Sequence, residues 1–204
     1  MTRTPLLILK ALPILLMAAP ALAGQQAAQS WFAERGYVEP SGGRIIACHG
    51  YGCARRLPLS VEGGWLSRAA AALRAAQGSP DAERRALADV IRSYTSLLAA
   101  SFGGRPDVPG SPPQMSGVPG QMDCLDETAN TTSLLLVLQD RGLLTHHVVD
   151  HPESRGFFFD GRYPHFTAVI AEKRTGVEWA VDPWKKAPGQ RPDILPLDRW
   201  RQDS

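Results

Sequence analysis

The chain has few cysteines, three in 204 residues, and none lies in the C-x-x-C-H motif that attaches haem. Cys48 and Cys53 are separated by four intervening residues in C-H-G-Y-G-C, a spacing that matches neither the C-x-x-C redox motif nor the common zinc sites. The two glycines between them give the segment enough freedom to reach disulfide geometry. We interpret the pair as a structural disulfide, with an exported thiol-redox pair as the alternative.

The sequence also lacks a large net charge. It contains 22 Lys and Arg against 20 Asp and Glu, and loss of Arg3 and Lys10 with a cleaved leader would make the two numbers equal. Proteins that attract nucleic acid or an anionic membrane surface usually carry a surplus of basic residues. The composition therefore predicts no nucleic-acid partner.

No apolar run is long enough for a membrane span of about 20 residues, because Lys10 and Pro13 interrupt the N-terminal one. Residues 1–23 have a basic start, an apolar centre and the small-residue pattern Ala-Leu-Ala at 21–23, as in a cleaved signal peptide. No cysteine follows this pattern, which argues against a lipid anchor. We expect a periplasmic or secreted protein without stable membrane insertion after signal removal, in which residues 24–204 form a single domain.

Helical periodicity is present in the first half of the mature chain. Apolar residues recur at helical spacing over 62–77 and again over 80–98. Ser79 is a suitable cap for the second segment, and Pro80 suits a first helical position. Residues 103–121 then contain five prolines and five glycines, so this stretch is expected to be a loop, either a mobile insertion or a rim beside a site.

A third helix is predicted from Cys124 to Asp140, with Asp123 as its cap and Gly142 after its end. Its later turns are apolar on every side, which places the helix in the middle of the domain. Its first turns are expected to face a polar cleft, because they carry Asp126, Glu127, Thr128 and Asn130. Cys124 would then lie where a buried helix reaches a groove.

Strands are predicted around 147–149, 157–159, 166–170 and 177–181. Helices followed by an antiparallel sheet define an α+β fold. The last two strands flank Lys-Arg-Thr-Gly, a hairpin turn in which Gly176 supplies a positive φ. A turn centred between Lys173 and Arg174 would place His165 directly opposite Asp182, with Cβ atoms about 4.5–5.5 Å apart.

Cys124, His165 and Asp182 follow the order of nucleophile, base and orienting acid. A thiol attacks an acyl carbon as thiolate, and it needs a base whose ring is held in a useful orientation. We expect the imidazolium of His165 to lower the pKa of the thiol, against the opposing effect of nearby carboxylates. His146, His147 and His151 compete as the base and could instead bind a metal, although no carboxylate spacing completes such a site. The Cys124 N–H and, more weakly, Gln121 are candidate oxyanion donors.

Three segments resemble the bacterial transglutaminase-like cysteine peptidases, a part of the transglutaminase-like and papain-like group. They are D-C-L-D at 123–126, P-H-F-T-A-V-I at 164–170 and V-E-W-A-V-D-P-W at 177–184. The resemblance covers about residues 120–185, although Glu127 stands where family members usually carry an aromatic residue. It implies a central cysteine-bearing helix packed against an antiparallel sheet, a Cys-His-Asp triad, and hydrolysis or transfer of an acyl group.

The sequence thus predicts an exported thiol hydrolase or acyltransferase that acts on an amide of a protein, a peptide or a related substrate. Cys124 would form an acyl-enzyme, His165 would move the proton, and Asp182 would hold the Nδ1 side of the ring. This chemistry needs neither a cofactor nor a metal. The alternative is a catalytically inactive binding or assembly protein of the same fold, which would hold a partner with the proline-rich loop and with exposed Trp184 and Trp200.

Overall fold

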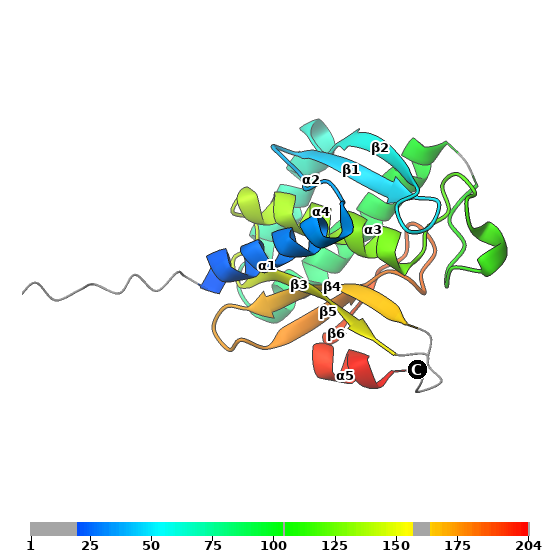
Figure 1. Cartoon of the computed structure of the whole chain (residues 1–204). Helices are drawn as coiled ribbons and strands as arrows, with labels where there is room; N and C mark the ends of the chain where they lie inside the picture. The colour runs from blue at the N-terminus through cyan, green and yellow to red at the C-terminus, as the bar shows by residue number, and fades with distance from the viewer. Residues whose placement is uncertain (1–19, 104, 157–163, 204) are drawn as a thin grey trace, which may run out of the picture.

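The computed structural model describes residues 20–103, 105–156 and 164–203, which form an α+β protein with two antiparallel sheets (Figure 1). In chain order the elements are α1 (Pro20–Arg35), β1 (Arg44–His49), β2 (Arg55–Ser60), α2 (Gly63–Ala75), α3 (Pro80–Phe102), the 3₁₀ turn η1 (Pro113–Met115), α4 (Cys124–Asp140), β3 (His147–Arg155), β4 (His165–Glu172), β5 (Glu178–Asp182), β6 (Asp193–Pro196) and α5 (Leu197–Gln202). Helices therefore dominate the first part of the chain and the larger sheet the second, as predicted.

Helix α4 lies at the centre of the molecule. It packs between the two-stranded β1–β2 sheet and the four-stranded sheet, whose strands are in the order β3-β4-β5-β6 (Figure 1). Its residues 134–138 are all buried, which agrees with their apolar character on every side of the helix. The main core surrounds α4 and includes Trp31, Phe32, Leu73, Leu87 and Ile91.

The ends of α4 form as the sequence predicts. The Asp123 side chain accepts the N–H of Asp126, and the Asp126 side chain accepts the N–H of Asp123, so the two residues form a capping box. At the other end, Gly142 has a φ of 65° and its N–H donates to Gln139 O. A left-handed residue here closes the helix with little steric cost when it is glycine.

The hairpin between β4 and β5 forms, but the predicted register is wrong. Ala168 pairs with Val181, which puts Thr167 rather than His165 opposite Asp182. The turn contains all four residues 173–176 and ends at Gly176 with a φ of 72°, so its centre lies one residue later than expected. A shift of two residues in pairing keeps His165 and Asp182 on the same face, as diagonal neighbours.

A small second core covers the other face of the four-stranded sheet. Val169 and Ala180 pack there against Leu197 and Trp200 of α5. The sheet is therefore covered on both faces, by α4 and α1 on one side and by α5 on the other (Figure 1). This arrangement brings the C-terminal helix to the strand ends that carry His165 and Asp182.

Two sequence predictions fall partly or wholly on residues outside the described part. The predicted strand at 157–159 lies outside it, as do residues 1–19 of the predicted signal peptide. The predicted cleavage position after Ala23 falls within the first turns of α1. Gly24, the next residue, lies so close to β3 that an added Cβ would be 2.5 Å from Val149 O.

Among the described helices, none combines the length and the apolar character that crossing a bilayer requires.

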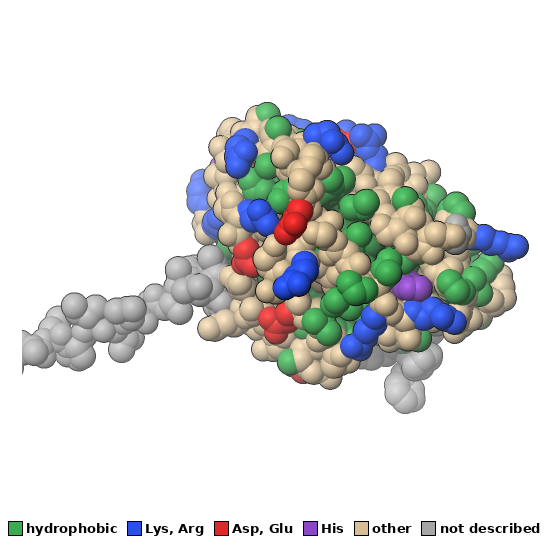
Figure 2. Space-filling view, turned by 90° about the horizontal axis from the view of Figure 1, so that it is seen from above, with side chains coloured by type: hydrophobic (Ala, Val, Ile, Leu, Met, Phe, Trp, Pro, Cys, Tyr) green, Lys and Arg blue, Asp and Glu red, His purple; other side chains and the backbone are tan. Residues whose placement is uncertain are grey.

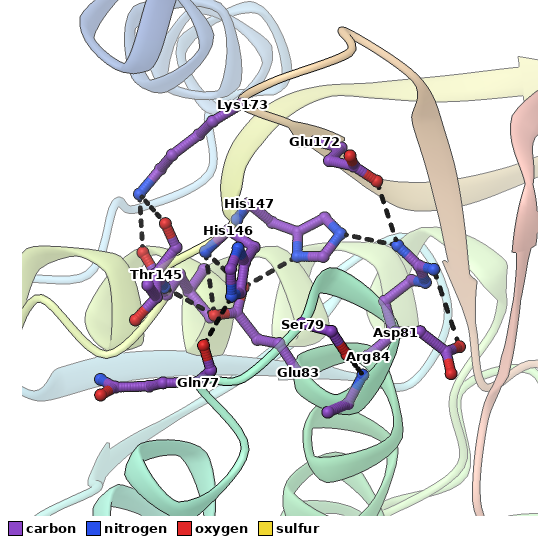
Figure 3. A network of polar contacts seen from close by, with 12 residues as sticks. Gln77, Ser79, Asp81, Glu83, Arg84, Thr145, His146, His147, Glu172 and Lys173 are labelled. Carbon is purple, nitrogen blue, oxygen red and sulfur yellow. Dashed lines mark hydrogen bonds and ion pairs between the residues drawn. The ribbon is translucent and has the colours of Figure 1, made fainter.

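A buried polar network joins α3 to the start of β3 (Figure 3). The Glu83 carboxylate, fully buried, accepts the backbone N–H groups of Thr145, His146 and His147 and also the His147 ring at 2.8 Å. The other ring nitrogen of His147 lies 3.1 Å from Arg84, whose guanidinium also pairs with Glu172. Burial would raise the pKa of Glu83, but these hydrogen bonds outweigh it and hold the pKa below its ordinary value of 4.5.

Replacement of Glu83 by Gln is expected to lower the free energy of unfolding by about 3 kcal/mol at pH 7, because a buried group with many donors loses its charge. A carboxylate whose folded pKa is depressed stabilises the fold above its unfolded pKa, and this contribution is lost as the pH falls through the folded pKa. Urea denaturation from pH 7 to pH 3 should therefore show the difference between wild type and Glu83→Gln shrinking below about pH 4.5. Glu34→Gln, at an exposed position, is the control, and a difference independent of pH would contradict the assignment.

Candidate active site

His165 and Asp182 form a hydrogen-bonded pair where β4 begins and β5 ends. Nε2 of His165 lies 2.7 Å from Oδ2 of Asp182, and both side chains are buried. His165 is hydrogen-bonded to Asp182, as predicted. The prediction had Asp182 bind Nδ1 of the ring, whereas it binds Nε2, and Nδ1 lies on the other side of the ring. Nδ1 is buried and has no hydrogen-bond partner among the described residues.

Two tryptophans enclose this pair. The Trp200 Nε1–H donates to Asp182 Oδ2 at 2.7 Å, and the Trp184 backbone N–H donates to Asp182 Oδ1 at 3.0 Å. Their rings lie against His165, with centroids at 4.2 Å for Trp184 and 5.5 Å for Trp200. Burial would raise the pKa of Asp182, but the hydrogen bonds from His165, Trp200 and Trp184 keep it below its ordinary value. Asp182 is therefore an ionised carboxylate that fixes the orientation of the imidazole.

Cys124 is the first residue of α4 and its thiol is buried at the start of β4. The backbone N–H of Phe166, the residue after His165, hydrogen-bonds to the sulfur. The structure thus brings the thiol to the same end of β4 as the imidazole. No hydrogen bond joins Nδ1 of His165 to the thiol among the described contacts.

The expectation of a low thiol pKa is not met. Burial raises the pKa of Cys124 to about 12, and the charges of Asp123, Glu127 and Asp182 act in the same direction, while the Phe166 N–H opposes them. Desolvation penalises the thiolate more than the N-terminal end of the helix stabilises it. The sulfur is therefore a protonated thiol at neutral pH in this state.

The first turns of α4 are buried instead of facing a polar cleft. Asp126, Glu127, Thr128 and Asn130 are each at most 5% exposed. Asn130 clamps β1 to α4, because its amide accepts the Cys48 N–H at 2.7 Å and donates to Cys48 O at 2.8 Å. Asp126 and Asn130 thus satisfy backbone groups of the β1–β2 hairpin, a role that composition alone could not distinguish from lining a cleft.

Glu127 differs from Asp126 and Asn130, because its Oε2 is buried without a hydrogen-bond partner among the described residues. Burial and the neighbouring charges of Asp107 and Asp182 raise its pKa well above the ordinary value. Burial also raises the pKa of Asp107 to about 6, although this carboxylate accepts the Met122 N–H at 2.7 Å. The carboxyl of Glu127, whose pKa is raised, thus lies about one helical turn from the thiol.

The proline-rich loop 103–121 borders the site, as its position before Cys124 suggested. Ser111 Oγ accepts the indole N–H of Trp184 at 2.6 Å and donates to Met122 O at 3.2 Å. Gln121, the weaker oxyanion candidate, is buried with its Nε2 donating to Arg105 O and Pro106 O. Its amide is therefore engaged in holding the loop, and the Cys124 N–H is the oxyanion candidate that remains.

The competing histidines are held elsewhere. His147 is fully buried between Glu83 and Arg84, and His146 Nε2 lies 2.8 Å from Gln77 O (Figure 3). Both belong to the network that joins α3 to β3, away from the thiol. His151 lies within β3, and its backbone N–H donates to Asp150.

Cys48 and Cys53 form the predicted disulfide. Their sulfurs and a carboxylate oxygen of Asp126 lie within 4.8 Å of one another, an arrangement that in other settings would bind a metal ion. Because the two sulfurs are joined to each other, neither is available as a thiolate ligand.

Trp200 is a site residue that sequence reasoning placed wrongly, as an exposed aromatic for binding a partner. It is 1% exposed and its indole is directed at Asp182. Trp184 is partly buried and hydrogen-bonded to Ser111. The contact of Trp184 with Asp182 could be expected from the sequence, because the two residues are only two positions apart. Nothing in the sequence around Trp200 indicates its hydrogen bond to Asp182, which lies 18 residues away.

An apolar groove of about 390 Å³ lies on the β1–β2 hairpin, away from the triad residues. Val38, Ile46, Pro58 and Leu59 line it, and Val38 is 46% exposed. Figure 2, seen from above, shows hydrophobic side chains in several groups on this face, with Lys and Arg side chains between and around them.

No family model, curated protein or solved structure matches the chain.

The buried, protonated thiol leads to a prediction for the free protein. With the pKa of Cys124 near 12, alkylation by iodoacetamide should be slow at pH 7 and its rate should still rise at pH 10. The rate should change little in His165→Ala, because no hydrogen bond links the two side chains in this state. Peptide mass analysis identifies the labelled residue. Rapid labelling that levels off well below the free-thiol pKa of about 8.5 would instead reveal a Cys-His ion pair.

Proposed function

We propose that the chain is an exported transglutaminase-like thiol hydrolase or acyltransferase that acts on an amide bond of a protein, a peptide or a related substrate. The observation that carries the proposal is the His165–Asp182 hydrogen bond, which leaves Nδ1 without a partner, while the thiol of Cys124 lies at the backbone N–H of Phe166, the next residue along β4. The order along the chain and the motifs around the three residues support the same family. The disulfide and the signal-like N-terminus support a periplasmic or secreted location.

The reaction begins with a neutral thiol. As the Cys124 sulfur attacks the amide carbon, Nδ1 of His165 takes its proton, and Asp182 stabilises the imidazolium through Nε2. The bond from carbon to nitrogen then breaks, the amine leaves with the proton from His165, and a thioester remains on Cys124. Water or a second amine attacks this acyl-enzyme and gives a proton to His165, the carbon–sulfur bond breaks, and His165 passes that proton to the sulfur.

The helix N-terminus supplies the charge stabilisation. The amides of Asp126 and Glu127 donate to Asp123, whereas helix geometry leaves the Cys124 and Leu125 amides without an intrahelical acceptor. An oxyanion that forms next to Cys124 is therefore beside free N–H donors and the positive end of the helix dipole. This stabilisation acts on the tetrahedral intermediate, where negative charge develops.

The second candidate function is a catalytically inactive binding or assembly protein. The raised pKa of Cys124 and the apolar groove on the β1–β2 hairpin favour it. Trp184 and Trp200 do not, because their indole N–H groups are used inside the fold. A protein of this kind would keep its partner when Cys124 is replaced, whereas the enzyme would lose turnover.

The triad is tested with a panel of peptide and amide substrates, with and without hydroxylamine as the acyl acceptor. Cys124→Ala is expected to abolish turnover, and Asp182→Asn to lower kcat by about 10⁴-fold, because it favours the wrong imidazole tautomer. Mass analysis of rapidly quenched samples should find an acyl adduct on Cys124, and hydroxamate formation would reveal transfer. His146→Ala, at a histidine outside the site, is the control. Turnover that survives in Cys124→Ala would refute the assignment.

Trp200 is expected to position Asp182. Trp200→Phe keeps an aromatic ring but removes the N–H that binds Oδ2, so kcat/KM should fall about tenfold, the effect of losing one hydrogen bond to a charged group. The lower limb of the pH profile should also move, because the Asp182–His165 pair loses a donor. Trp31→Phe is the matched control, since Trp31 is equally buried and its indole N–H has no partner among the described residues. Equal effects of the two substitutions would mean that Trp200 contributes only packing and does not position Asp182.

A further inference from the structure

The Cys48–Cys53 loop has an unusual backbone. Its residues Gly50, Tyr51, Gly52 and Cys53 all have positive φ, at 85°, 70°, 60° and 58°. Glycine adopts this conformation readily, whereas Tyr51 and Cys53 do so at a cost in free energy. The disulfide joins the two ends of the loop and holds it in this left-handed turn.

The turn directs three consecutive backbone N–H groups at the start of α4. The N–H groups of Tyr51 and Cys53 donate to the two oxygens of Asp126 at 2.8 and 2.6 Å. The Gly52 N–H donates to Asp123 Oδ2 at 2.9 Å. Successive N–H groups in a turn of this kind form a concave anion-binding site, and here the anions are two carboxylates of the same chain.

These two carboxylates also cap the helix that begins with Cys124. Asp123 accepts the Asp126 N–H at 2.9 Å, and Asp126 accepts the Asp123 N–H at 3.3 Å. The loop therefore binds the residues immediately before and two positions after the nucleophile. Asp126 is fully buried, and burial raises its pKa to about 7 although the N–H groups of Cys53, Tyr51 and Asp123 act to lower it, so its charge depends on these donors in place of water.

The two ends of the loop are held differently. Cys48 is fixed to α4 by two hydrogen bonds from its backbone to Asn130, with or without the disulfide. Cys53 is packed in the main core, but its N–H bond to Asp126 is the one described hydrogen bond that ties it to α4. Cleavage of the disulfide would therefore leave the Cys53 end with a single hydrogen bond to the helix, and the positive φ of Tyr51 and Cys53 favours its departure.

We propose that the Cys48–Cys53 disulfide is a positioning element for Cys124, so that the accessibility and reactivity of this thiol depend on the redox state of the loop. The proposal rests on the proposed function of Cys124 as nucleophile. A dithiol reductant supplies two electrons and two protons, the S–S bond breaks into two thiols, and the dithiol closes to its own disulfide. The loop amides then leave Asp123 and Asp126, the buried carboxylate of Asp126 recruits water, and the first turn of α4 opens. The active site would thus be assembled only where the disulfide forms.

The test compares the full chain before and after treatment with dithiothreitol, with reoxidation as the return step. Hydrogen exchange over residues 123–130 is expected to accelerate at least about tenfold on reduction, the effect of losing one charge-assisted hydrogen bond, while residues 134–138 stay protected. Cys124 should become more accessible to iodoacetamide and follow the pH dependence of an ordinary thiol, with a pKa of about 8.5. Turnover should fall, and reoxidation should restore all three properties. Peptide masses separate Cys124 from the two newly reduced cysteines.

The variant Asp126→Asn tests whether the effect of reduction passes through the hydrogen bonds from the loop to Asp126, because Asn can accept at only one of the two oxygen positions. This variant, kept oxidised, should show the faster exchange at 123–130, and reduction should add little to it, since both changes remove the same contact. Unchanged exchange and labelling after reduction would overturn the proposal, as would a loss of protection that extends equally to 134–138. If the oxidised chain has no turnover on any substrate, the proposed function fails, while exchange and labelling still decide whether the disulfide positions Cys124.

Discussion

The carboxylate of Asp126 joins three parts of the chain at the start of the central helix. It accepts N–H groups from Tyr51, Cys53 and Asp123, and it is fully buried. A buried carboxylate without donors is costly, so the loop and the helix can reach this position only together. The N-terminus of α4, and with it the thiol of Cys124, is consequently fixed by segments more than 70 residues away in sequence.

This arrangement exposes the thiol to negative charge. Burial and three nearby acidic residues raise the pKa of Cys124, whereas the His165 ring is already paired with Asp182. A preformed thiolate would need a cation closer than the structure provides. In the proposed reaction we therefore expect proton transfer to His165 during attack in place of a resting ion pair. In that case the hydrogen bond from Phe166 to the sulfur orients the thiol without ionising it.

Local signals in the sequence were sufficient for several elements. The capping pattern at Asp123, the glycine at 142, the apolar stretch 134–138 and the short loop between Cys48 and Cys53 all led to correct predictions, because each depends on neighbours within a few residues. The strand register was wrong by two residues, since the turn length was judged from its sequence alone. The burial of Asp126 and Asn130 was also missed, because their partners lie on the β1–β2 hairpin.

Cys124 and the His165–Asp182 pair, the two halves of the candidate site, are held in place by different parts of the fold. Cys124 begins α4, whose later turns lie in the main core, whereas Asp182 is held by Trp200 of α5, which belongs to the core on the opposite face of the sheet. The two halves meet at the first two residues of β4, where His165 provides the imidazole and Phe166 provides the N–H for the thiol. Neither core alone determines the relation of sulfur to imidazole. That relation depends on how β4 is placed between α4 and α5, which explains why residues remote from the chemistry, such as Trp200 and Tyr51, bear on it.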